Sequence, residues 1–289
     1  RHYVFNFSDL FRTTVIDRFV SDYENGRTPN PCIDCNRHLK FDKLFQRAKE
    51  LGFDYVVTGH YARIEYDEKS GRYLLKKALD DTKDQSYVLY SMTKEQLAHT
   101  RFPLGALRKT EVREIAGQNG FVNARKHDSQ DICFVQHGTY ADFIKKTTGK
   151  DYPAGDFIDS AGNVLGRHKG IIYYTVGQHK GLGISSEEPW YVKEVRPAEN
   201  TVVLCRSEEL FTSVLEAADV NLISVDRIDA PMRVCAKVRY RQKEQPATVT
   251  QLENGHIRVE FDQPQRAITK GQAVVLYDGD IVVGGGTIV

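Results

Sequence analysis

The change of sequence pattern along the chain constrains its fold more than any other feature. Up to about Phe134, helical and strand patterns alternate: apolar residues recur at helical spacing over 41–51, and a short β-branched strand is predicted over 55–58. Beyond Gly149, glycines punctuate short apolar runs, and from about Ala217 onward short strands alternate with turn residues. This pattern predicts an α/β region followed by two β-rich regions.

The length of the chain agrees with several domains, because 289 residues exceed the size at which a single hydrophobic core usually stops growing. We predict an α/β domain over 1–148, a small β-rich central domain over 149–214 and a C-terminal β-barrel over 215–289. The strands predicted for the barrel are 233–241, 247–252, 256–261 and 273–277.

Composition limits the classes of protein that need to be considered. The 40 Lys and Arg against 39 Asp and Glu leave a net charge of +1, so a polyanionic partner must be held by a local basic surface. Five cysteines, an odd number, do not indicate a secreted disulfide framework and suit a reducing compartment. With no leader-like segment and no apolar run of roughly eighteen residues, we expect a cytoplasmic protein without a membrane partner.

The first residues predict a strand over 2–7 that begins without a lead-in, and residue 1 is Arg rather than Met. We therefore expect that the natural N-terminus precedes Arg1.

Two cysteines at CxxC spacing form the sharpest local feature. Cys32 and Cys35 follow a turn-forming Pro-Asn-Pro and precede the predicted helix. A thiol near a helix start can have its pKa lowered by the helix dipole, which would favour a reactive sulfur. The same spacing also serves half a zinc site, for which His38 and His60 are the nearest further ligands, or a pair of structural thiols.

Two further polar segments lie in the α/β region. Gly59 and His60 come just past the carboxyl end of the predicted strand, where ligands bind in open α/β sheets. The segment 79–89 is a polar loop that feeds an apolar run, and its residues alone favour a solvated turn with a helix cap. Helix starts are predicted at Thr93, with Gln96 in a capping box, and at Thr110.

The other three cysteines differ in their surroundings. Cys133 follows the polar run 128–131, yet a single Cys beside Ile and Phe is more often a small buried hydrophobe than a catalyst. Cys205 lies in an apolar run and is predicted to be core, and Cys235 is assigned no chemistry.

The last region carries a run of cations at odd-numbered positions. If 233–241 is one continuous strand, these cations share one face and the apolar residues between them share the other. A phosphate-binding stripe and an ordinary solvated face are both compatible with this pattern. The cations are Arg233, Lys237, Arg239, Arg241 and Lys243. The run Gly284-Gly285-Gly286 has no helix after it and is not predicted to bind phosphate.

Six short segments together resemble the bacterial and organellar tRNA-specific 2-thiouridylase family, in an order and spacing that match nearly the whole chain. They are 26–36, 58–63, 83–87, 129–134, 174–178 and 239–242.

The resemblance implies an ATP-pyrophosphatase (PP-loop, adenine nucleotide alpha-hydrolase-like) domain lacking its first strands, a small central domain and a C-terminal β-barrel. By this likeness Cys35 is the nucleophilic thiol and Cys133 carries a persulfide. The implied reaction uses ATP, with Mg²⁺ expected, to activate the 2-oxygen of the tRNA wobble uridine; sulfur replaces it, and a transient Cys35–Cys133 disulfide ends the cycle. No tightly bound metal is expected.

The same likeness assigns binding roles. Gly59 matches a nucleotide contact, and Asn30, Pro31 and Cys32 match the stretch that faces the target base. The positions that match tRNA contacts are His60, Lys83, Asp84, Gln85, Arg239, Tyr240 and Gln272. The implied partners are tRNAs for Lys, Glu and Gln and a sulfur donor such as a cysteine desulfurase or a sulfur-relay protein.

Two departures from the family pattern matter. Many relatives have Asp where this chain has Cys32, which adds a third thiol to the site. The Ser-Gly-Gly-Val-Asp-Ser-Ser loop that cradles the ATP phosphates is not in this sequence, so we expect weak ATP binding and poor turnover by the chain alone. The alternatives are another ATP-pyrophosphatase, such as an amide-forming ligase, and a non-catalytic zinc or redox RNA-binding module.

Overall fold

Two long helical segments lie at the start of the computed structural model, which describes residues 2–125 and 132–289. The first comprises α1 (Ser8–Phe11), η1 (Arg12–Ile16) and α2 (Asp17–Glu24); the second comprises α3 (Pro31–Asp34), η2 (Cys35–Lys43) and α4 (Leu44–Glu50). Both η1 and η2 are π-helical turns, and the backbone stays right-handed through every junction. The helix predicted over 41–51 therefore exists but begins earlier, at Pro31.

The caps of the second helical segment follow its sequence. Asn30 is the N-cap and Pro31 takes the first helical position, where its missing N–H costs nothing. Gly52, with φ +74°, follows the last turn in the left-handed conformation. The strand predicted over 2–7 is wrong: these residues pair with no strand, and the rings of Tyr3, Phe5 and Phe7 stack on one another instead.

A small parallel sheet follows. Strand β1 (Val56–Val57) pairs with β4 (Thr100–Arg101), so Gly59 and His60 lie past the carboxyl end of β1 as predicted. The predicted capping box of Thr93 and Gln96 begins α5, whereas α6 begins one residue before Thr110. The bounds here are η3 (Ser86–Leu89), α5 (Lys94–Ala98), η4 (Pro103–Ala106) and α6 (Lys109–Gln118).

The C-terminal strands form a closed six-stranded barrel, because β13 pairs with both β10 and β14. Its strands are β9 (Phe211–Leu222), β10 (Met232–Lys237), β11 (Gln245–Gln251), β12 (Ile257–Arg266), β13 (Ala273–Asp278) and β14 (Ile281–Ile288). The strand predicted over 233–241 ends at Lys237, since residues 238–241 form a bend and a turn. The run Gly284-Gly285-Gly286 is a buried part of β14.

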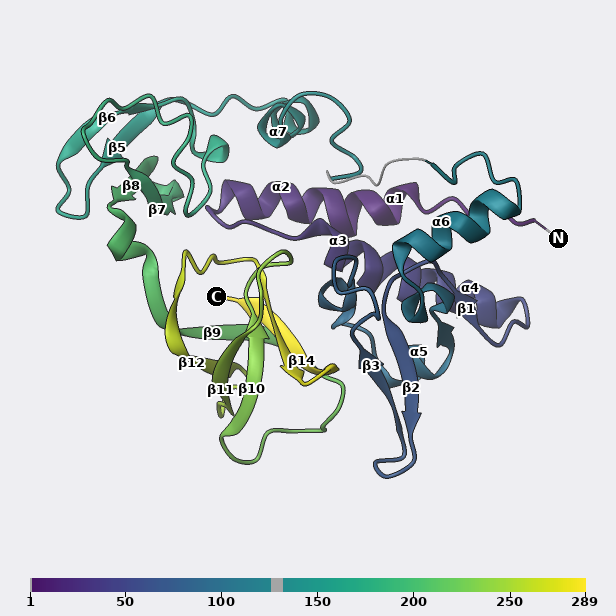
Figure 1. The fold of residues 1–289 in the computed structure, drawn as a ribbon. Coiled ribbons are helices and arrows are strands. Elements are labelled where there is room, and N and C mark those ends of the chain that lie inside the picture. The colour runs from purple at the N-terminus through teal and green to yellow at the C-terminus, as the bar shows by residue number, and fades with distance from the viewer. Residues whose placement is uncertain (1, 126–131) are drawn as a thin grey trace.

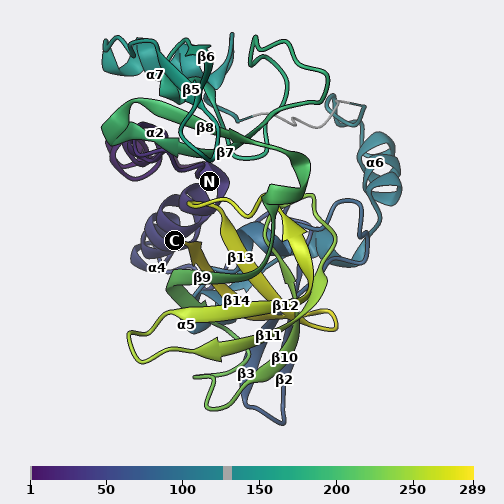
Figure 2. The ribbon, with the colours of Figure 1, turned by 90° about the vertical axis from the view of Figure 1, so that its left-hand side faces the viewer.

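The α/β region also contributes a hairpin to the barrel sheet. This hairpin consists of β2 (Arg63–Asp67) and β3 (Arg72–Lys76), and β3 joins β14 where Lys76 pairs with Ile281. Figure 1 shows the hairpin projecting beside the barrel, and Figure 2 shows the barrel from another side, with β9, β11 and β12 running across the view.

The central region forms a separate four-stranded sheet in the order β6-β5-β8-β7. Its elements are α7 (Tyr140–Thr148), β5 (Gly155–Ile158), β6 (Val164–His168), η5 (Ile171–Tyr173), β7 (Tyr191–Arg196), η6 (Pro197–Glu199), β8 (Thr201–Cys205) and η7 (Ser207–Leu210). Helix α7 lies over α2 and crosses it (Figure 1), and Phe19 and Tyr23 of α2 share a buried cluster with Ile144 of α7. Cys205 is fully buried in this region, as predicted.

One core cluster joins the α/β region to the barrel. Ile33 and Phe41 from the second helical segment pack with Tyr87 of η3 and with Val275 and Tyr277 of β13. The barrel therefore holds the helix that carries Cys32 and Cys35. The domain boundaries at 148 and 214 remain predictions. None of the described helices is long and apolar enough to cross a membrane.

Candidate active site

The barrel fixes the segment that precedes the helix carrying Cys32 and Cys35. Gln272 donates its side-chain N–H to the carbonyl oxygens of Thr28 (2.8 Å) and Pro29 (3.2 Å), and Thr28 donates its backbone N–H to Lys270 O (2.9 Å). The Asn30 side-chain oxygen then accepts from the backbone N–H of Cys32 at 3.2 Å. Gln272, expected to contact tRNA, thus holds the segment that leads into the site.

The structure brings three thiols within electrostatic range of one another. Cys32 is exposed and Cys35 is half-buried one turn later, so they share a face of the helix. Cys133, which is exposed, contributes to raising the pKa of both, although it is remote in sequence. The two thiols that the family resemblance pairs, Cys35 and Cys133, therefore belong to one cluster.

The expected lowering of the thiol pKa at the helix start is wrong. Desolvation by the surrounding protein raises the pKa of Cys35, and the charge of Lys40 only partly opposes it. The pKa of Cys32 is raised for the same first reason, although its side chain reaches solvent. Loss of hydration of the thiolate is the largest influence on both pKa values.

Cys133 sits on an anchored turn. Its neighbour Phe134 packs edge-on against Phe11 and Phe19, with ring centroids 5.8 and 5.3 Å apart, and lies 5.1 Å from Phe143 of α7. Because Phe134 is fixed, Cys133 is held at the surface beside the first helical segment. The rest of its motif, residues 129–131, lies outside the described residues.

Tyr240 enters the same site from the barrel. Its ring is 38% exposed and lies 6.0 Å from that of Tyr87. Burial raises the pKa of Tyr240, and the negative charge of Asp84 and the thiolate of Cys32 act in the same direction. The half-open ring beside Cys32 is suited to stacking on a nucleobase.

The polar loop before η3 is ordered by its own side chains. Asp84 accepts from the backbone N–H groups of Ala78 (3.0 Å) and Ser86 (3.2 Å) and from the Ser86 hydroxyl. Gln85 exchanges hydrogen bonds with the backbone of Tyr61 (2.9 and 2.8 Å), and the backbone N–H of Lys83 donates to Asp80 O. The loop is therefore fixed by hydrogen bonds within the fold, whereas its residues alone favoured a solvated turn.

The cationic stripe does not exist as one strand face, because β10 ends at Lys237. Arg233 makes a two-pronged ion pair with Asp262, at 2.8 and 2.7 Å. Arg239 turns inward, and its guanidinium donates to Ala267 O (2.7 Å), the Thr269 hydroxyl (2.9 Å) and Val176 O (3.3 Å). Arg239 therefore ties the barrel to the central region.

His60 is enclosed. It is 8% exposed and its ring centroid lies 5.6 Å from that of Phe41 and 5.7 Å from that of Phe102. Its Nδ1 lies 2.8 Å from the Thr58 hydroxyl and its Nε2 3.4 Å from Lys40 Nζ. Burial, followed by the charge of Lys40, lowers the pKa of His60 to about 4. Sequence reasoning missed Lys40, whose only signal was its distance of five residues from Cys35.

Both ring nitrogens of His60 thus have protein partners, Thr58 and Lys40. Among residues 2–125 and 132–289, no three His, Cys, Asp or Glu side chains form a group that could hold a metal ion.

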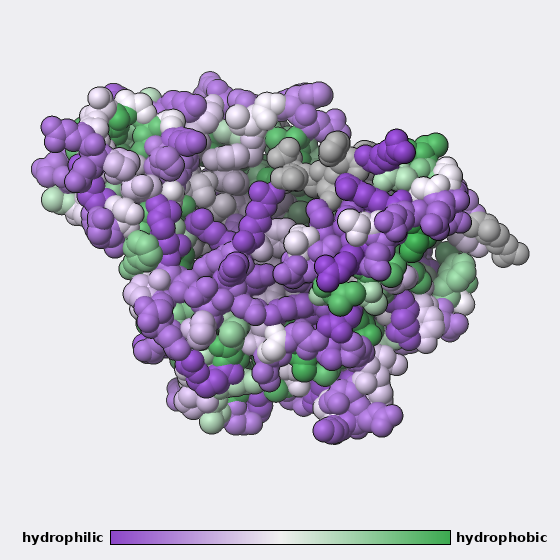
Figure 3. Space-filling model, viewed as in Figure 1, coloured by the Kyte–Doolittle hydropathy of each residue, from purple (hydrophilic) through white to green (hydrophobic). Residues whose placement is uncertain are grey.

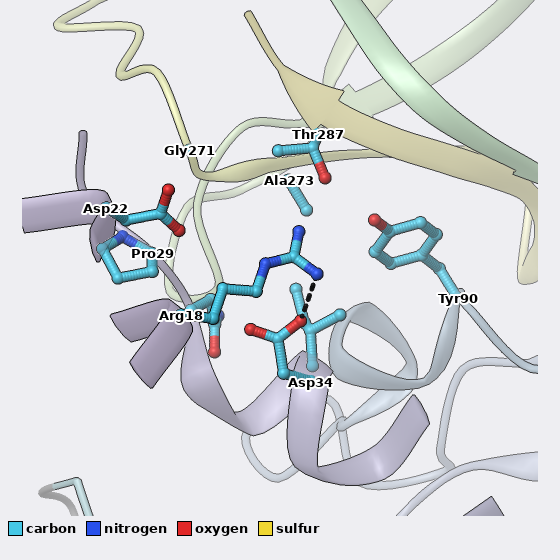
Figure 4. Close-up of a pocket in the computed structure, with 10 residues that line it drawn as sticks. Arg18, Asp22, Pro29, Asp34, Tyr90, Gly271, Ala273 and Thr287 are labelled. Carbon is cyan, nitrogen blue, oxygen red and sulfur yellow. Dashed lines mark ion pairs between the residues drawn. The ribbon is translucent and has the colours of Figure 1, made fainter. Parts of the chain in front are cut away.

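A small polar pocket lies between the helical segments and the barrel, beside the helix that carries Cys32 and Cys35. Figure 4 shows Arg18 reaching over Asp34, with Nη1 to Oδ1 at 3.1 Å, and Tyr90 and Thr287 closing the other sides. Burial raises the pKa of Asp34 to about 6, although the charges of Arg18 and Arg37 lower it. Asp34 was also missed, because nothing in the sequence marks it as buried.

The raised pKa of Asp34 predicts a pH dependence of stability. The folded state binds the proton of Asp34 more tightly than the unfolded state does. The contribution of Asp34 to the free energy of unfolding therefore becomes more favourable as pH falls from about 7 to about 4. The ionised form costs about 2 to 3 kcal/mol at neutral pH, from roughly 1.4 kcal/mol per pKa unit. Urea unfolding of Asp34→Asn and the parent chain should therefore give a stability difference that favours the variant more at pH of about 7.5 than at about 4.5. Parallel pH curves would contradict this assignment.

Three known protein families match successive parts of the chain. Residues 1–137 match the family model described as a tRNA methyl transferase HUP domain, 141–206 a tRNA methyl transferase PRC-barrel domain and 212–288 an aminomethyltransferase beta-barrel domain. These matches and the closed barrel confirm the predicted architecture of PP-loop domain, central domain and C-terminal barrel.

Several curated relatives match almost the entire chain. A tRNA-specific 2-thiouridylase of Clostridioides difficile is 54% identical over 286 residues, which are 99% of this chain and 79% of the relative. One of Thermoanaerobacter sp. is 54% identical over 288 residues, 100% of this chain and 79% of the relative. One of Acetivibrio thermocellus is 52% identical over 287 residues, 99% of this chain and 80% of the relative.

Proposed function

Because the chain belongs to the tRNA-specific 2-thiouridylase family, we propose that it is a tRNA-uridine 2-sulfurtransferase that replaces the 2-oxygen of the wobble uridine with sulfur. The observation that carries this proposal is the cluster of Cys32, Cys35 and Cys133. Two of these thiols lie at the start of one helix, and the third comes from a segment that is remote in sequence. A sulfur transfer that ends in a disulfide needs two thiols at one base.

The proposed transfer assigns one role to each of two thiols. Cys133 carries the sulfur as a persulfide, whose terminal atom forms a bond to C2 of the activated uridine. The Cys35 thiolate then attacks the Cys133 sulfur and breaks the S–S bond of the persulfide. Sulfur stays on the base, and Cys35 and Cys133 are left as a disulfide that an external thiol reductant must reopen.

ATP, when bound, supplies the adenylyl group that makes the uridine 2-oxygen a leaving group, with AMP and pyrophosphate as products. The position of Gly59 past the carboxyl end of β1 fits a nucleotide contact. A Cβ added at Gly59 would meet only Leu104, at an ordinary 3.5 Å, so packing within the protein is not what requires glycine there. We expect Mg²⁺ to accompany the triphosphate.

We propose that some residues contact the base or the tRNA directly, whereas others hold the contacting segments in place. Asn30, Pro31 and Cys32 present the helix start to the base, and Tyr240 offers it a stacking surface. Gln272 and Arg239 act by fixing the segments around them. The face seen in Figure 3 is predominantly hydrophilic, which suits an RNA partner.

The proposed substrates are the tRNAs for Lys, Glu and Gln, and the proposed sulfur donor is a cysteine desulfurase or a sulfur-relay protein. The direct test is mass analysis of wobble nucleosides from cells that lack the complete gene. We expect 2-thiouridine derivatives to disappear and to return with the wild-type gene but not with Cys35→Ser. An unchanged content of 2-thiouridine in the deletion strain would refute the proposed function.

A further inference from the structure

The π-helical turn η2 begins at Cys35 and carries Lys40, whose charge lowers the pKa of Cys35. Residues five apart do not share a face of an α-helix, which has 3.6 residues per turn. In η2, which begins at Cys35, the hydrogen bonds span five residues, as in the bond from Leu44 N–H to Leu39 O. This register turns the side chain of Lys40 toward the same side as the thiol, and such turns are frequent at functional sites.

His60 holds the other side of the Lys40 ammonium. His60 Nε2 lies 3.4 Å from Lys40 Nζ, and with His60 neutral this nitrogen accepts while Nδ1–H donates to the Thr58 hydroxyl. The ring cannot turn away because Phe41 and Phe102 enclose it. Within the described residues Lys40 has no carboxylate ion pair, so its charge is not cancelled by a neighbouring acid.

The charged and titratable groups around the thiols are few. Cys133 and Asp34 both raise the pKa of Cys35, and Lys40 is the group that lowers it. At Cys32 Lys40 is the weakest of the four influences on the pKa, whereas at Cys35 it ranks directly after burial. Lys40 therefore lowers the pKa of both thiols, and only at Cys35 does it come before every other neighbouring charge.

We propose that Lys40, oriented by His60, is the positioning residue that holds Cys35 rather than Cys32 as the thiolate that resolves the persulfide. This inference rests on the proposed role of Cys35 in sulfur transfer. The thiolate forms at the half-buried position, within electrostatic range of Cys133, and the charge of Lys40 stabilises it.

The test is the pH profile of Cys35 alkylation by iodoacetamide, resolved by peptide mass spectrometry on the reduced protein without ATP or tRNA. Lys40→Met keeps the aliphatic stem but removes the charge. We expect the midpoint of the Cys35 profile to rise by about one pH unit, which slows alkylation near neutral pH about tenfold. The profile of Cys32 should move less, and Lys40→Arg should retain most of the wild-type behaviour.

The matched control is Lys43→Met, since Lys43 lies in the same helical turn but points to Gln46 at 3.4 Å. It should leave the Cys35 profile unchanged. His60→Asn, a second variant that keeps Lys40, should raise the Cys35 midpoint by a smaller amount. Coincident Cys35 profiles for the parent, Lys40→Met and His60→Asn would overturn the inference, as would an equal shift with Lys43→Met. Because alkylation needs no substrate, this result is separate from the nucleoside analysis that tests the function.

Discussion

Replacing Cys35 or Cys133 by serine reduces wobble-uridine thiolation to background, a loss of about 10³-fold or more, as expected when a nucleophile is removed. One sulfur cannot both carry the persulfide and resolve it, so neither thiol substitutes for the other. The measurement is single-turnover thiolation by the protein expressed from its complete gene, with the nucleoside product quantified by mass spectrometry.

The control for this pair is Cys235→Ser, because Cys235 is half-buried on β10 and has no proposed chemistry. It should retain activity within about a factor of a few, since a modest packing change does not remove transition-state contacts. Turnover by Cys35→Ser or Cys133→Ser comparable to this control would refute the two-thiol assignment.

Arg239→Ala destabilises the protein by about 2 to 4 kcal/mol, the loss expected when a half-buried charged donor is removed from three acceptors. Those acceptors are Val176 O, Ala267 O and the Thr269 hydroxyl, so the loss also loosens the barrel from the central region. Urea unfolding measures this cost, and the salt dependence of tRNA binding by the folded variant should be unchanged.

The matched control is Arg258→Ala on β12, whose side chain is 51% exposed and 3.6 Å from Glu260. It should cost less than about 1 kcal/mol. If Arg239→Ala kept full stability while the salt slope of tRNA binding fell by roughly 0.7 to 0.9, Arg239 would be a phosphate contact and its structural role would be wrong.

The parts of the fold that sequence predicted are those set by local chemistry. The capping box at Thr93 and the glycine cap at Gly52 depend on neighbouring residues alone. The barrel strands β11, β12 and β13 alternate buried and exposed residues or are continuously apolar, and they were found where predicted. By contrast, the strand predicted to run to Arg241 ends at Lys237, because the alternation of apolar and charged residues in the sequence continues into a turn.

The features that sequence could not predict depend on tertiary contacts. The register of the π-helical turn and the enclosure of His60 by two aromatic rings create the site of Lys40, and neither leaves a local pattern. The same holds for the inward turn of Arg239 and the burial of Asp34. The pairing of Cys35 with Cys133 came from family resemblance, since the residues next to Cys133 alone favoured a buried thiol without a catalytic role.

Disulfide mapping after one turnover shows whether sulfur passes from Cys133 to the base while Cys35 resolves the persulfide. Protein carrying a heavy-sulfur persulfide on Cys133 is mixed with ATP and unmodified tRNA, alkylated and digested. We expect heavy sulfur in the wobble nucleoside and an equivalent amount of Cys35–Cys133 linked peptide. Thiolated tRNA accompanied by a Cys32–Cys133 link, or by no disulfide at all, would contradict it.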